Sequence, residues 1–185
     1  MMQPHGTARG NRALLFALSL LLAGGLLVPV HRARAQDRPS PALYDVAIDP
    51  LDLLAQQGPL NLQYEWETSP VNSWVVRAHY WSVTPWGGFG AGAAYRFYIA
   101  DSRALNGLSV APAADIFFLN DGNLGHAATD VWLGGDLGYK WIFNQFSVEP
   151  LIGLRIGFAA GSPASNLGAS TGGVAQISVY LGYAW

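Results

Sequence analysis

The chain has 185 residues, a formal net charge of −2, no cysteine and only 12% charged side chains, whereas a soluble domain usually carries about a quarter. It is also rich in glycine, with 22 residues, and in aromatic residues, at 12%. The absence of cysteine excludes disulfide bonds, thiolate metal sites and cysteine nucleophiles.

The first 35 residues have the pattern of a secretory signal. Arg9 and Arg12 precede the apolar run "ALLFALSLLLAGGLLVPV", and residues 33–35 read "ARA", a small-x-small cleavage site. An uncleaved membrane helix is disfavoured, because two glycines and a proline interrupt the run. The sequence therefore predicts a cleaved signal at 1–35, a flexible mature N-terminus at 36–42 and one β-domain at 43–185.

The charge that remains after cleavage argues against a nucleic-acid partner. The signal removes four of the ten basic residues and none of the twelve acidic ones, and no basic run is left. The remaining chain also has no run of about 18 apolar residues, so it holds no membrane-spanning helix. A closed sheet, in which every backbone group bonds between strands, is then the one membrane-compatible structure.

The first predicted strand is the weakest. In "LYDVAI" (43–48), three apolar residues alternate with Asp45 and Ala47 over a short length. The following "DPLDLLAQQGP" has leucines at helical spacing behind Asp49 and Pro50, a common helix start. We expect a short helix near 50–57 in the first connection, with a piece of plug inside the barrel as the alternative.

Seven longer segments alternate apolar and polar residues and are separated by turn signals. In "LNLQYEWE", for example, Leu62 and Tyr64 lie on one face while Gln63 and Glu65 lie on the other. Together with 43–48, they predict an all-β protein, an eight-stranded antiparallel transmembrane barrel. The seven segments are 60–67, 73–81, 88–99, 108–118, 130–141, 146–158 and 174–185.

The connections fit one topology. Barrels of this kind have short periplasmic turns and longer outer loops. If the last strand runs toward the periplasm, the connections at 68–72, 100–106 and 142–145 are periplasmic. Those at 82–87, 119–129 and 159–172 are external and include the two longest.

If the apolar faces contact lipid, most of the charge points into the barrel. Such charges are tolerated when they are paired, and an eight-stranded barrel is narrow enough to be filled by its own side chains. We therefore expect a structural ion-pair network, with a polar path for a small solute as the alternative. Its predicted members are Glu65, Arg77, His79, Arg96, Asp115, Asp136, Lys140, Glu149 and Arg155. Glu67 and Asp130 also face inward, and Tyr98, Gln176 and Tyr180 are expected to fill the remaining space.

No catalytic, cofactor-binding or metal-binding residues are predicted. His79 and Ser82 form the one close His/Ser pair after the signal, and positions three apart on a strand point to opposite faces. The acidic residues are scattered along the strands, without metal-ligand spacing.

Aromatic residues near the strand ends are expected at the two membrane interfaces, where amphipathic rings gather. The predicted interfacial residues are Trp66, Trp74, Trp141, Tyr183 and Trp185.

The signal, the repeats "GFGAGAAYRFY" and "GGDLGYKW" and the final "VYLGYAW" resemble the small eight-stranded outer-membrane barrels of Gram-negative bacteria, the OmpA/OmpX-like group. More narrowly, "DPLDLL", "LNLQYEW" and "GYKWIF" look similar to an uncharacterised family of outer-membrane barrels. The resemblance implies fold, compartment and recognition of the C-terminal strand by the barrel-assembly machinery, and it implies no catalytic residues. Phenylalanine is the usual last residue in that group, so Trp185 departs from the pattern.

The sequence thus predicts a non-enzymatic protein of the bacterial outer membrane, with a structural or surface-interaction role. Its predicted partners are outer-membrane lipid and the assembly machinery, and no cofactor is expected. A narrow solute channel is the alternative, followed by a lipid-modifying enzyme that depends on His79. A soluble lipid-binding barrel, with its aromatic faces turned inward, is a further alternative.

Overall fold

The structure is a computed structural model that describes residues 42–51, 60–83, 86–100, 102–121, 126–160 and 172–185. The predicted signal at 1–35 and most of the flexible segment at 36–42 lie outside these residues. Among the described residues, no helix is long and apolar enough to cross a membrane.

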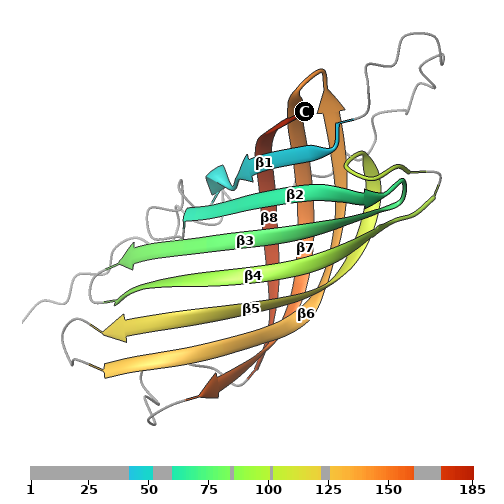
Figure 1. Cartoon of the computed structure of the whole chain (residues 1–185). Coiled ribbons are helices and arrows are strands. Elements are labelled where there is room, and N and C mark those ends of the chain that lie inside the picture. Colours follow the sequence, from blue (N-terminus) through green and yellow to red (C-terminus); the bar gives the residue numbers. More distant parts are fainter. Residues whose placement is uncertain (1–41, 52–59, 84–85, 101, 122–125, 161–171) are drawn as a thin grey trace, which may run out of the picture. The chain divides into compact units, whose positions relative to one another are not determined.

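Eight antiparallel strands form a closed barrel, and each strand pairs with its neighbours in chain order (Figure 1). This confirms the predicted all-β, eight-stranded antiparallel barrel, including the eighth strand near residue 43, and its placement in a membrane stays a prediction. The strands are β1 Tyr44–Ile48, β2 Leu60–Ser69, β3 Asn72–Val83, β4 Trp86–Tyr98, β5 Gly107–Asp121, β6 His126–Phe143, β7 Phe146–Ala160 and β8 Gly172–Ala184.

The strands extend beyond the alternating segments. β5 continues to Asp121 and β6 begins at His126, so the expected connection at 119–129 shortens to 122–125. The added residues 119–121 still pair with both β4 and β6, but Asn120 takes the position where the outward series would need an apolar residue, so the alternation ends before the strand does. The connections predicted from the turn signals are therefore longer than those in the structure.

β1 closes the barrel by pairing with both β2 and β8. Asp45 lies opposite Ala184 and Ile48 opposite Leu181. The backbone of Trp185 adds to this junction by exchanging hydrogen bonds with Tyr44, at 2.9 and 3.0 Å. The last residue therefore continues the ladder between the first and last strands.

Asp49 and Pro50 end β1. The Asp49 amide still donates to the Asn61 carbonyl at 3.0 Å, but proline has no N–H with which to continue the ladder. The Asp49 carboxylate accepts a hydrogen bond from the Leu51 amide at 2.9 Å, as a residue at a helix start does. Pro50 and Leu51 are helical, and the rest of the helix predicted near 50–57 lies outside the described residues.

The connection between β4 and β5 folds against one end of the barrel. Leu105 has a φ of 63°, a region that is costly for a bulky side chain, and its side chain is fully buried. It packs with Ala104 and Tyr98, and Ile142 of β6 lies against the group. The Ala104 amide also donates to the Pro70 carbonyl at 2.9 Å. An apolar cap therefore covers this end of the barrel.

One glycine allows a close approach of two strands. A Cβ atom on Gly134 of β6 would lie 1.8 Å from the carbonyl oxygen of Leu154 in β7. A backbone oxygen cannot move aside as a flexible side chain can, so any side chain at this position must push the two strands apart.

We expect Gly134→Ala to lower the free energy of unfolding of the barrel by about 2 kcal/mol or more, because it overpacks this contact. Gly173→Ala is the matched control, since a Cβ atom there would meet its nearest neighbour at 3.9 Å, and its effect should stay within about 0.5 kcal/mol. Denaturant titration of both variants in detergent measures the difference. Equal stability of the two variants would contradict the close approach.

Candidate functional site

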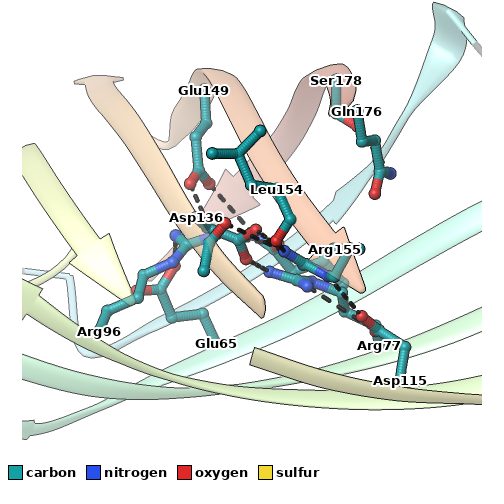
Figure 2. A network of polar contacts seen from close by, with 12 residues as sticks. Glu65, Arg77, Arg96, Asp115, Asp136, Glu149, Leu154, Arg155, Gln176 and Ser178 are labelled. Carbon is teal, nitrogen blue, oxygen red and sulfur yellow. Dashed lines mark hydrogen bonds and ion pairs between the residues drawn. The ribbon is translucent and has the colours of Figure 1, made fainter. Parts of the chain in front are cut away.

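The charged residues predicted for the lumen meet inside the barrel. All nine are buried, and they come from six strands, β2 to β7. Figure 2 shows the acidic side chains and the three arginines among them. Each points inward because it occupies the polar register of its strand, while its apolar neighbours on either side point outward. The side chains form two clusters.

The first cluster consists of Asp45, Glu65, Arg96, Lys140 and Glu149. Arg96 bridges two carboxylates, with Nη1 2.7 Å from Glu65 Oε2 and Nη2 2.6 Å from Glu149 Oε1. Lys140 Nζ contacts Asp45 and Glu65, and it lies 3.3 Å from Glu149 Oε2. Three carboxylates therefore share two cations.

Neutral side chains complete the hydrogen bonds of this cluster. Tyr98 donates its hydroxyl to Glu65 Oε1 at 2.7 Å, and Ser73 donates to the same oxygen. Ser147 donates to Asp45 Oδ1 at 2.7 Å, and Gln63 donates to Glu149 Oε2 at 3.1 Å. These contacts supply the additional donors that a buried carboxylate needs.

The second cluster consists of Arg77, His79, Asp115, Asp136 and Arg155. Arg155 donates from Nε to Asp115 Oδ2 at 3.0 Å, and its Nη1 lies 2.7 Å from Asp136 Oδ1. Arg77 bonds to Asp136 and lies 3.8 Å from Asp115 Oδ1. Two arginines thus share two aspartates, and their formal charges cancel.

His79 is held at the edge of the second cluster. Its Nδ1 lies 2.5 Å from Asn61 Oδ1 and its Nε2 lies 3.3 Å from Asp115 Oδ1. The ring also packs against Phe117, with centroids 5.0 Å apart. Ser82 lies on the opposite face of β3 and is exposed, so these two residues do not form the base and nucleophile of a hydrolase.

Asp45, Glu65 and Glu149 are the residues whose arrangement most resembles a metal site. Their oxygens lie within 4.8 Å of one another. Each of them contacts Lys140, and Glu65 and Glu149 also contact Arg96, so side-chain cations already lie where a metal ion would bind. The chemistry of this group is that of a shared ion pair.

The sequence pattern did not predict that Asp45 belongs to the first cluster. Asp45 is fully buried and pairs with Lys140, but it lies in the strand with the shortest alternating pattern. The sequence feature that indicates its inward direction is its position between Tyr44 and Val46, whose side chains point outward. Of the two remaining inward predictions, Glu67 is half-buried and Asp130 is buried.

The predicted interfacial aromatics lie on the outer face of the barrel. Trp74, Tyr183 and Trp185 are exposed, and Trp66 and Trp141 are half-buried. Trp185 stacks on Tyr44 across the closing junction, with ring centroids 5.7 Å apart. Their location at a membrane interface remains a prediction.

A scan against protein-family models, a search of curated proteins and a search of solved structures each found no match. The resemblance to the OmpA/OmpX-like group therefore remains a prediction. Any functional argument for this chain has to come from its own geometry.

Lys140→Met tests the first cluster. The variant leaves Asp45, Glu65 and Glu149 with Arg96 as their one cation, and breaking a buried pair in this way costs about 3–5 kcal/mol. We expect the free energy of unfolding to fall by that amount. Asp45→Asn, added to Lys140→Met, should restore part of the loss by removing one uncompensated charge.

Arg103→Met is the control for this substitution. Arg103 is an exposed cation in the β4–β5 connection, so its loss should change the free energy by at most about 0.5 kcal/mol. Denaturant titration of the three variants in one detergent gives the comparison. A loss no larger for Lys140→Met than for Arg103→Met would show that the lysine does not hold the cluster together.

Proposed function

We propose that this chain is an integral β-barrel protein of the bacterial outer membrane, with a structural or surface-interaction role and no enzymatic activity. The observation that carries the proposal is the inverted polarity of the barrel. Its charged side chains are buried inside, and its large apolar side chains are exposed outside. This distribution of charged and apolar side chains is energetically favourable when lipid surrounds the barrel.

The exterior supports contact with lipid over most of the strands. Exposed fractions reach 64% for Leu154, 61% for Phe89 and 60% for Phe143. A monomer in water rarely exposes a continuous apolar surface of this kind. In the soluble lipid-binding alternative the aromatic faces point inward, whereas here Trp74, Tyr80 and Phe89 point outward and are exposed.

The interior supports a filled rather than conducting barrel. Arg96, Lys140 and Tyr180 are each almost completely buried, and the two ion-pair clusters join side chains from opposite parts of the wall. The apolar cap around Leu105 covers one end. Because these groups satisfy one another, a passing ion would have to displace paired charges.

The orientation and the partners follow from the sequence pattern. With the signal removed, the cap and the short β2–β3 and β6–β7 turns would face the periplasm, and the longer connections would face outward. Outer-membrane lipid is the proposed partner of the exterior. The assembly machinery is the proposed partner of β8, on the basis of the resemblance given above.

Arginine substitution on the outer face separates a lipid-facing barrel from a water-facing one. Leu154 lies in the middle of β7, and Phe143 lies at the end of β6 next to a turn. We expect Leu154→Arg to destabilise the barrel in lipid vesicles by about 2–4 kcal/mol, and Phe143→Arg by about 0–1 kcal/mol. Unfolding titrations in vesicles measure both values. Equal tolerance of the two arginines would contradict a membrane-spanning wall.

Fractionation and conductance test location and role. We expect the processed chain in the outer-membrane fraction, as a heat-modifiable species on gels, and no unitary conductance when it is inserted in planar bilayers. Recovery from the soluble periplasm would overturn the membrane assignment. Steady conductance with a selectivity that changes in Arg96→Gln would favour the channel instead.

A further inference from the structure

Asp130 is a buried lumen-facing acid that belongs to neither cluster. It is 5% exposed, and its Oδ1 atom has no hydrogen-bond partner. It takes part in none of the ion pairs between described residues, although every carboxylate of the two clusters does. An unpaired carboxylate at this depth is unfavourable, so its position calls for a partner.

Among the residues that the structure describes, the lumen-facing neighbours of Asp130 on β5 and β6 carry no positive charge. The lumen-facing positions beside it on β6 are Ala128 and Trp132, and Phe117 lies directly opposite on β5. The two arginines of the second cluster, Arg77 and Arg155, are already engaged with Asp115 and Asp136. Asp130 therefore faces aromatic carbon rather than nitrogen.

Phe117 shares the lumen-facing register of Asp115 on β5, and Gly90 leaves room for its ring. A Cβ atom on Gly90, the β4 residue opposite Phe117, would lie 2.5 Å from Phe117 Cδ1. The ring also packs on His79, which is an inward residue. On β6, Trp132 occupies the same register as Asp130 and Asp136, which places it on the lumen side as well.

Accessible surface remains at this end of the lumen. Phe117 and Trp132 are half-buried, and because they point inward, their accessible surface lies within the barrel. On β8, Val174 lies opposite Arg155 on the lumen side and is 46% exposed. Figure 2 shows Gln176 of the same strand apart from the ion-paired side chains. This part of the interior is thus less completely filled than the clusters.

We propose that Asp130, Phe117 and Trp132 form a binding site for a small organic cation, an amine or quaternary ammonium group. A carboxylate supplies the counter-charge, and aromatic faces attract ammonium groups that have partly lost their water. A hard metal ion would instead need several oxygen ligands, and the lumen-facing neighbours of Asp130 provide none. The site does not depend on the membrane assignment, because it lies inside the barrel.

The test is a titration of the folded protein with tetramethylammonium chloride, followed through the indole N–H signal of Trp132 in NMR spectra. Trp132→Phe identifies that signal among the seven tryptophans of the chain. The protein is held in a maltoside detergent, because phosphocholine headgroups would themselves compete as quaternary ammonium groups. tert-Butanol and pivalate, of similar size, are the neutral and anionic comparison probes.

We expect a saturable shift of the Trp132 signal with tetramethylammonium and none with tert-butanol or pivalate. Asp130→Asn should weaken binding by about tenfold or more, because it removes the counter-charge. Phe117→Leu should weaken it by about threefold through loss of the ring. Glu67→Gln is the matched control. It removes a half-buried lumen-side carboxylate near the C-terminal end of β2, away from Asp130, and it should leave binding unchanged.

Three results would overturn the proposal. They are a shift that never saturates, an equal response to tert-butanol, and equal affinity in the wild-type chain and Asp130→Asn. Spectral dispersion and heat-modifiable mobility establish that each variant is folded. If Asp130→Asn does not fold, Phe117→Leu decides the matter, because unchanged affinity in that variant would exclude the aromatic site.

Discussion

The pairing of charge inside the barrel is the constraint on which the rest of this structure depends. A lone charge removed from water is strongly unfavourable, and a pair is tolerated only with good geometry and further hydrogen bonds. Arg96 meets Glu65 and Glu149, and Arg155 meets Asp115 and Asp136. Because these residues come from different strands, the pairs exist in one strand register only. The interior thereby selects the register that also turns the apolar residues outward.

Alternation predicted the eight strands and the direction of nearly every side chain, because a period of two is a local property of an extended chain. It placed Arg77 and Lys140 inside and Leu154 outside. It could not show which cation meets which carboxylate, since those contacts join residues far apart in sequence, as Lys140 and Asp45 are. Single-strand patterns carry no information about the partner across the lumen.

Alternation also failed to predict two other features, for a different reason. Leu105 lies in a connection, where an apolar residue has no periodic neighbours to indicate burial, yet it is fully buried beneath the barrel. Asp130 was expected to face inward, and it does, but it lies opposite Phe117 and takes part in none of the ion pairs between described residues. In both cases the deciding fact is which residue lies alongside on another strand, and that depends on the register of the whole sheet.

The short first strand has a consequence for how the barrel forms in time. Asp45 bonds to Lys140 and Ser147, which lie 95 and 102 residues later in the chain. Joining residues so distant requires closing a very long loop, so these contacts come late in folding. Interactions absent from the folding transition state act mainly on the rate of unfolding. The junction between β1 and β8 therefore sets the lifetime of the folded barrel more than the speed at which it is reached.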